Sequence, residues 1–248
     1  MINPRTIGGY SLVELMIGLL LGSAVLIGLL QVFATASQAY KAQTGEYDLQ
    51  QSGQFALHFL AREIRQAGYV DKPWMEDKLP AIDATSTDTG GAGDQLVSQY
   101  YSERNCFGTK NSPDESGEAP FYLKQTRFAL RTTQRQLTWW CAYGPAGETP
   151  IVQANNQTLV EGVDSFQVLY GEDSDADGNP DRWVNAGNWE SAGNIAVVTL
   201  ALLIADKNSL TDVEPPDYTV LDHQTGTLES NERRELLQTT IALRNYRP

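Results

Sequence analysis

An aspartate-rich segment near residue 175 offers the clearest metal-ligand pattern in the sequence. Alternate carboxylates can direct hard oxygen ligands at one cation, and a backbone carbonyl can add another, which suits calcium. Gly178 permits the sharp bend that such a loop needs. The candidate ligands are Asp173, Asp175, Asp177, Asn179 and Asp181.

This segment resembles the first nine positions of an EF-hand calcium loop but departs from it at the end. The twelfth position is Val184 instead of a bidentate glutamate, and the flanking sequence predicts a strand and a loop instead of two helices. Two interpretations therefore stay open, a calcium-binding loop and a solvated acidic turn without metal. Calcium is the one cofactor that the sequence indicates.

A single glutamate, Glu14, stands at the start of an apolar run in which residues 15–40 carry no charge. A carboxylate at bilayer depth costs about 2.5 to 3.5 kcal/mol, so Glu14 is a candidate functional residue that needs a positive partner. Arg5 on the short N-terminal side favours a cytoplasmic N-terminus. The general alternatives are a secretory signal cleaved near residues 34–36 and an uncleaved signal anchor.

Two cysteines, Cys106 and Cys141, lie 35 positions apart and beyond the apolar run, where this topology places the chain in an oxidising periplasm. We expect a structural disulfide between them. A thiol nucleophile would need an activating partner, and neither His58 nor His223 stands in a catalytic motif. The sequence also lacks the closely spaced cysteine or histidine pairs of a zinc site.

A long helix is expected to carry Glu14. No proline occurs between Pro4 and Pro73, apolar residues follow three-and-four spacing up to residue 67, and Gly68 is a C-terminal stop signal. A helix over residues 11–67 would be roughly 85 Å long at about 1.5 Å per residue. We expect its first half to lie in a membrane and its second half to pack against a soluble domain.

Beyond the helix, the sequence predicts a β-rich domain. Residues 71–93 resemble a connecting loop, and residues 195–205 are apolar and β-branched enough for a central strand, with a buried helix as the alternative. The predicted fold class is therefore α+β, a long N-terminal helix packed on an antiparallel β-rich head. The predicted strands lie near residues 96–100, 121–124, 127–131, 136–140, 163–170, 195–205 and 236–243.

The charge balance argues against some classes of partner. The chain has a formal net charge of -13, from 18 basic and 31 acidic residues, and the charge lies almost wholly beyond the apolar run. An acidic head is a poor ligand for nucleic acid and for anionic lipid. The sequence contains no GxSxG, HExxH, P-loop or dinucleotide motif. We therefore predict a protein that is not an enzyme and does not bind nucleic acid.

The apolar run is preceded by Gly-Tyr-Ser-Leu-Val-Glu-Leu at residues 9–15, which resembles the type III signal of type IV pilins and type II secretion pseudopilins. The resemblance implies that a prepilin peptidase cuts after Gly9 and methylates Tyr10. It divides the chain into a leader (residues 1–9), a helix (residues 10–68) and a head (residues 69–248). It further implies that Glu14 neutralises the new amine of Tyr10 on a neighbouring subunit.

Three further tracts, at residues 59–69, 170–181 and 238–245, narrow the resemblance to PilW-type minor pilins. Such proteins are implied to assemble with other major and minor pilins, to prime type IV pilus assembly and to remain at the pilus tip. The implied location is the bacterial inner membrane with a periplasmic head, and the extracellular pilus after assembly. The nearest alternative is a J-type pseudopilin of type II secretion. From another class, the alternative is a membrane-anchored calcium-dependent binding module or hydrolase.

Overall fold

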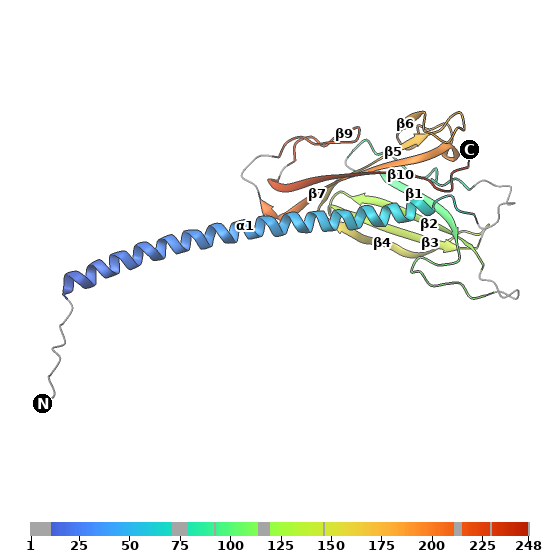
Figure 1. Ribbon diagram of the computed structural model, residues 1–248. Coiled ribbons are helices and arrows are strands. Elements are labelled where there is room, and N and C mark those ends of the chain that lie inside the picture. The colour runs from blue at the N-terminus through green and yellow to red at the C-terminus, as the bar shows by residue number, and fades with distance from the viewer. Residues whose placement is uncertain are drawn as a thin grey trace. The chain divides into compact units, whose positions relative to one another are not determined.

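The computed structural model describes residues 11–70, 79–91, 93–113, 120–145, 147–210, 215–228 and 230–247. Within these ranges, one long helix, α1 (Leu12–Gln66), precedes two four-stranded antiparallel sheets (Figure 1). The predicted α+β fold is therefore confirmed. The chain divides into two compact units, one up to Glu46 and one from Tyr47 onward, which we call the head unit. Helix α1 contributes residues to both units.

The first unit consists of the N-terminal part of α1. Ser11 caps the helix, because its Oγ accepts a hydrogen bond from the N–H of Val13 (3.3 Å) and its carbonyl oxygen accepts one from Leu15 (3.2 Å). All large apolar side chains from Leu12 to Phe33 are exposed. By length and composition, this helix can cross a membrane.

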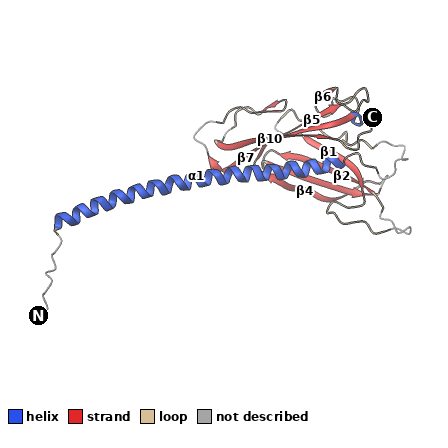
Figure 2. Cartoon of the chain, in the orientation of Figure 1, coloured by secondary structure: helices blue, strands red, loops and turns tan. Residues whose placement is uncertain are grey.

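The head unit is built on two sheets, shown in red in Figure 2. The first sheet follows the chain order β1-β2-β3-β4, whereas the second has the order β10-β7-β5-β6, which makes β7 an inner strand. The first sheet contains β1 (Gln95–Ser102), β2 (Tyr122–Arg131), β3 (Gln136–Gly144) and β4 (Ile151–Glu161). The second contains β5 (Val163–Glu172), β6 (Arg182–Val184), β7 (Ile195–Leu210) and β10 (Glu232–Ala242).

Smaller elements complete the head unit. A short hairpin is formed by β8 (Thr219–Val220) and β9 (His223–Gln224), and a 3-10 helix, η1 (Ala192–Asn194), precedes β7. Gly162 makes the single-residue connection between β4 and β5, and so between the two sheets. Its φ is +77°, and a Cβ atom would lie 2.4 Å from the carbonyl oxygen of Ala205. Only glycine fits this connection without displacing the backbone of β7.

The part of α1 from Tyr47 onward packs against both sheets. The Phe59 ring lies 6.1 Å from the Phe128 ring on β2 and 5.5 Å from the Trp139 ring on β3. The Gly53 backbone approaches the Leu237 side chain on β10 closely. The residues buried in the main core are, on the helix, Leu49, Ala56, Leu57, Leu60, Ala61 and Ile64, and directly after it Ala67. The three-and-four spacing seen in the sequence is therefore the buried face of the helix.

One buried ion pair joins this part of α1 to the first sheet. Lys124 Nζ on β2 lies 3.4 Å from Glu63 Oε2, and the two side chains are only 9% and 4% exposed. Tyr100 on β1 donates a hydrogen bond to the same carboxylate oxygen (2.8 Å). Arg62, which is mostly exposed, contacts the other oxygen at 3.2 Å. Both oxygens of the buried carboxylate therefore have partners, as a buried charge requires.

The C-terminal end of α1 is capped by the other end of the chain. Gly68 adopts a φ of +76°, and its N–H donates to the carbonyl oxygen of Gln99 (2.8 Å), so it ends the helix as predicted. At the helix end, Asn245 Nδ2 donates to the carbonyl oxygens of Arg65 (3.5 Å), Gln66 (3.2 Å) and Ala67 (3.2 Å). The tail after β10 is therefore held against the helix end.

Most of the predicted elements are confirmed. The structure forms the helix at residues 12–66 against a prediction of 11–67, and residues 195–205 form a strand, not a helix. The predicted strands near residues 121–124 and 127–131 are one strand, β2. The described part of the predicted loop at residues 71–93 makes isolated bridges through Ile82 and Thr87. The sequence did not predict β4, β6, β8 or β9.

Candidate functional site

The aspartate-rich segment forms the loop of the β5–β6 hairpin, between the paired residues Glu172 and Arg182. Glu172 is fully buried, and Arg182 contacts its Oε2 through Nε (3.0 Å) and Nη2 (2.8 Å). The N–H groups of Glu190 and Ser191 donate to Oε1 of Glu172, at 2.7 and 3.2 Å. This buried, fully paired carboxylate fixes both ends of the loop.

Asp173 organises the interior of the loop. Its Oδ2 accepts hydrogen bonds from the N–H of Gly178 (2.8 Å) and the hydroxyl of Tyr246 (3.1 Å), and its Oδ1 accepts one from the N–H of Asp177 (3.2 Å). Burial raises the pKa of Asp173, but the hydrogen bonds together lower it by more than burial raises it. The pKa of Asp173 therefore lies below its ordinary value. Gly178 has a φ of +92°, which confirms its predicted role in the bend.

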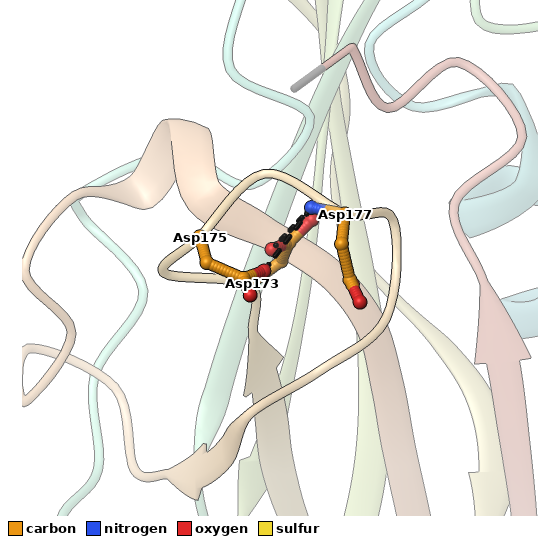
Figure 3. A group of neighbouring side chains, drawn as sticks. All are labelled: Asp173, Asp175 and Asp177. Atoms are coloured by element: carbon orange, nitrogen blue, oxygen red, sulfur yellow. Dashed lines mark hydrogen bonds between the residues drawn. The ribbon is translucent and has the colours of Figure 1, made fainter.

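Three carboxylates meet in this loop, on Asp173, Asp175 and Asp177, and one oxygen from each lies within 4.8 Å of the others (Figure 3). The N–H of Asp177 lowers the pKa of Asp175 by donating to it, but the negative charges of Asp177 and Asp181 outweigh this effect and raise that pKa. The group thus has the oxygen chemistry that a hard cation prefers, together with a repulsion that a cation would relieve.

The remaining two candidate ligands have other contacts. Asp181 Oδ2 accepts a hydrogen bond from the N–H of Ser174 (2.7 Å), and Asp181 lies outside the group of three. The N–H of Asn179 donates to Asp177 Oδ1 at 2.7 Å. The structure therefore brings together three of the four predicted carboxylates.

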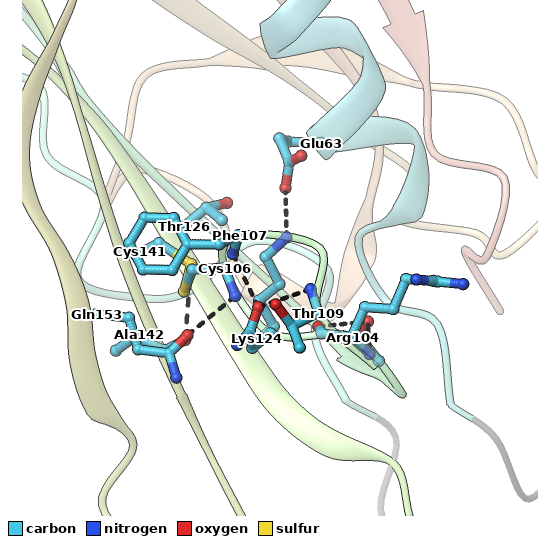
Figure 4. The surroundings of a disulfide bond; sticks show 12 residues. Glu63, Arg104, Cys106, Phe107, Thr109, Lys124, Thr126, Cys141, Ala142 and Gln153 are labelled. Carbon is cyan, nitrogen blue, oxygen red and sulfur yellow. Dashed lines mark hydrogen bonds and ion pairs between the residues drawn. A yellow bond between two sulfur atoms is a disulfide. The ribbon is translucent and has the colours of Figure 1, made fainter. Parts of the chain in front are cut away.

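Cys106 and Cys141 form the predicted disulfide, with Cα atoms 6.0 Å apart (Figure 4). The bond ties the loop after β1 to β3, and both cysteines are buried. The N–H of Cys106 donates to Gln153 Oε1 on β4 at 3.0 Å, so the loop also contacts the outer strand of the sheet. Next to it, Phe107 is 68% exposed. The disulfide therefore holds a surface loop that presents an aromatic side chain.

The predicted assembly residues lie at the other end of the chain. Glu14 lies in the first turn of α1 and is exposed. Its carboxylate has no hydrogen bond or ion pair to any residue that the structure describes. Gly9 and Tyr10 lie outside the described residues.

Residues 123–245 match the family model described as type IV pilus-assembly protein W, PilW. This part of the chain is similar to the PilW family. The match begins in β2 and ends at Asn245, so it includes the second sheet, the aspartate-rich loop and Cys141. The predicted resemblance to PilW-type proteins is thereby confirmed.

One solved structure similar to this chain is a type IV-like pilin from Thermus thermophilus. The two are 17% identical, with a TM-score of 0.48, and the likeness covers 80% of this chain and 98% of that pilin. No curated protein matches the sequence.

One notable residue of the head unit carried no signal in the sequence. Asp94, just before β1, is buried, and its Oδ1 has no hydrogen-bond partner among the described residues. Burial raises the pKa of Asp94 to about 7, although the N–H of Val168 donates to Oδ2 (2.9 Å) and lowers it in part. Nothing in the neighbouring sequence marks this aspartate as buried, because its burial depends on β5 packing against it.

Proposed function

We propose that this protein is a minor pilin that assembles with other pilins, primes formation of a type IV pilus and remains near the pilus tip. The observation that carries the proposal is the PilW-family match in a chain whose N-terminal helix is apolar and uncovered. The role is structural. Before assembly the helix would lie in the inner membrane with the head in the periplasm, and afterwards the protein would be part of the extracellular filament.

The proposed maturation step explains the position of Glu14. Cleavage after Gly9 by a prepilin peptidase would leave a cationic amine on Tyr10, which the same enzyme would methylate. The carboxylate and the amine are both costly to bury in lipid without a partner, so pairing across two subunits favours docking. An intermolecular pair would thus couple removal of the leader to assembly.

N-terminal mass spectrometry of the mature chain tests this maturation step. We expect a chain that begins at Tyr10 and carries one added methyl group. Gly9→Leu should keep the leader, and Gly8→Leu serves as the control because Gly8 precedes the cleavage position. A mature chain that begins near residue 35 would instead identify an ordinary signal peptide, and cleavage of Gly9→Leu would contradict the assignment.

A second experiment tests the role of Glu14 in assembly. Glu14→Gln keeps the side-chain size and removes the charge, so insertion into the membrane should be unaffected. We expect the amount of this protein in sheared pili to fall at least about tenfold, which corresponds to a loss of about 1.4 kcal/mol. Glu46→Gln is the control, since Glu46 lies on the same helix beyond the uncharged run. Normal incorporation of Glu14→Gln would refute the pairing.

We also propose that the aspartate-rich loop binds calcium. The support is that three carboxylates meet in this loop, and that the Glu172–Arg182 ion pair fixes both ends of the loop. Calorimetric titration of the full chain in detergent should give a dissociation constant of about 0.1 to 1 mM, as in extracellular calcium modules. Asp175→Asn should abolish the heat, whereas Asp217→Asn, an exposed aspartate elsewhere, should not. If no heat of binding were detected at a calcium concentration about 10-fold above this dissociation constant, the loop would be an acidic turn without metal.

A further inference from the structure

One cavity in the head unit is lined by both arginine and aromatic side chains. It has a volume of about 300 Å³ and lies where the end of α1, the end of β1 and the tail after β10 meet. The residues that define its chemistry are Arg65, Tyr69, Tyr101, Phe121 and Arg244. We call it the arginine-aromatic pocket. It does not share a residue with the aspartate-rich loop.

The two arginines of this pocket have no partner among the described residues. Neither guanidinium group makes a hydrogen bond, an ion pair or a ring contact with any described residue. Acidic residues outnumber basic ones by 31 to 18 in this chain, so partners for arginine are abundant. The other described arginine without such a contact is Arg131, at the end of β2. Two of the three described guanidinium groups that have no partner among the described residues therefore line one cavity.

The backbone at both arginines is held rigidly. Arg65 lies in the last turn of α1, next to Ile64, which is fully buried in the core. Arg244 lies between buried Leu243, whose N–H donates to the carbonyl oxygen of Ala196 (2.9 Å), and Asn245, which caps the helix. Both side chains thus start from fixed backbone positions, one at the end of α1 and one in the C-terminal tail, so the cost of ordering the site on binding is reduced.

The aromatic side chains give the pocket an apolar wall. The rings of Tyr69 and Phe121 lie 6.1 Å apart, and the N–H of Tyr101 donates to the carbonyl oxygen of Tyr69 at 2.8 Å. Tyr69 is still 39% exposed, so a ligand can cover its ring. Glu103 also lines the pocket, but its charge is paired with Lys110 at 2.8 Å. Arg104 lines the pocket as well, but it donates to the carbonyl oxygen of Gly108 (2.9 Å) and lies 3.9 Å from Glu103. The positive charges of the site that have no partner among the described residues are therefore those of Arg65 and Arg244.

We propose that the arginine-aromatic pocket binds an acidic side chain of a partner protein together with a neighbouring aromatic side chain. Guanidinium groups match the planar geometry of a carboxylate, and the rings of the wall can stack on an aromatic residue. The volume lies at the lower limit for small-molecule sites and suits a pair of side chains. Arginine and tyrosine in a pocket are also the composition typical of interface hot spots.

The test uses the full chain in detergent and two capped tetrapeptides, one with glutamate beside phenylalanine and one with glutamine in its place. Titration followed by ligand-observed NMR should give the glutamate peptide a dissociation constant of about 1 mM or tighter. The glutamine peptide should bind at least about fivefold more weakly, as should the glutamate peptide to Arg65→Gln or Arg244→Gln. Arg131 is also exposed, lies outside the pocket and has no partner among the described residues, so Arg131→Gln should bind like the wild type.

Several results would overturn the proposal. Equal binding of the two peptides would remove the role of the carboxylate, and an equal loss in Arg131→Gln would reduce the effect to net charge. Binding of free N-acetylphenylalanine without binding of the glutamate peptide would identify a small-molecule site instead. Urea unfolding of each variant confirms that the head remains folded. None of these outcomes depends on leader removal or on Glu14.

Discussion

The ion pair between Glu63 on α1 and Lys124 on β2 offers a direct test of what holds the second part of α1 in the head unit (Figure 4). We consider the substitution Lys124→Met, which keeps a long side chain and removes the ammonium group. Glu63 would then stay buried with the Tyr100 hydroxyl and the exposed Arg62 as its remaining partners. The perturbation therefore isolates the loss of one buried positive charge.

The magnitude follows from burial and from the surviving contacts. Removal of one member of a buried ion pair typically costs about 3 to 5 kcal/mol, because the other charge is left without compensation. Solvent screening does not reduce this value much, since the side chains are 9% and 4% exposed. Arg62 can still reach the carboxylate from the surface, so we place the cost near the lower limit, at about 3 kcal/mol. Tyr100→Phe, which removes a hydrogen bond to a charged group, should cost about 2 kcal/mol.

The assay is urea unfolding of the full chain in detergent, followed by tryptophan fluorescence. All five tryptophans lie beyond residue 70, so the signal reports on the head unit. Arg62→Gln is the matched control, because it removes the other cation from the same carboxylate but from a side chain that is 62% exposed. It should cost less than about 1 kcal/mol. The double variant Glu63→Leu/Lys124→Leu should be more stable than Lys124→Met, because it buries no unpaired charge.

Two results would refute this reasoning. If Lys124→Met unfolded within about 1 kcal/mol of the wild type, the pair would be behaving as a surface ion pair. If the double leucine variant were less stable than the single variant, packing and hydrogen bonding in this region would matter more than compensation of charge.

Three further predictions concern other contacts of the head unit. The pKa of Asp94 is about 7 in the folded protein and near 4 in the unfolded chain. The free energy of unfolding should therefore fall by up to about 4 kcal/mol as the pH rises from about 4 to about 7. Asp94→Asn should abolish this fall, which a series of melting temperatures at different pH values would measure. Asn245→Asp removes the donor that caps α1 and should cost about 2 kcal/mol in urea unfolding. Replacement of Cys106 and Cys141 by serine should cost about 4 kcal/mol, with no further effect of reductant on that variant.

Local patterns in the sequence were sufficient to predict the helix and the central strand. Helix α1 has the three-and-four spacing and the glycine stop that make its boundaries readable, and the buried face agrees with that spacing. Residues 195–205 of strand β7 are almost all apolar or β-branched because this part of the strand is covered on both sides. Both patterns are strong because each buried position of these elements requires an apolar side chain.

Strand β4 shows why other elements were not predicted. Its central residues, Gln153 to Thr158, are mostly polar and carry no clean alternation, since β4 is an outer strand of its sheet. Register shifts against β3 break the two-residue period further, and Asn156 has a φ of +49°. Pairing with β3, a non-local contact, is what makes these residues a strand.

The candidate site could be predicted only in part, for a related reason. The alternating aspartates are adjacent in sequence, so their meeting in one loop was predictable. The Glu172–Arg182 pair that fixes the loop, and the cap that Asn245 provides to α1, join residues that the sequence does not mark as partners. Single-sequence patterns carry no information about such pairings, which depend on the packing of the sheets.

Helix α1 carries two glutamates in apolar surroundings, and their partners differ in kind. Glu63 is compensated within the chain by Lys124 and Tyr100. Glu14 has no partner among the described residues, although it lies in a segment where an unpaired carboxylate is costly. If each charge follows the same physical rule, the partner of Glu14 must come from residues that the structure does not describe, such as residues 1–10, or from another molecule. The amine that cleavage would create on Tyr10 could pair with Glu14 of the same chain, or with Glu14 of a neighbouring chain. A crosslink between positions 10 and 14 that forms between two chains, and not within one, would distinguish the two.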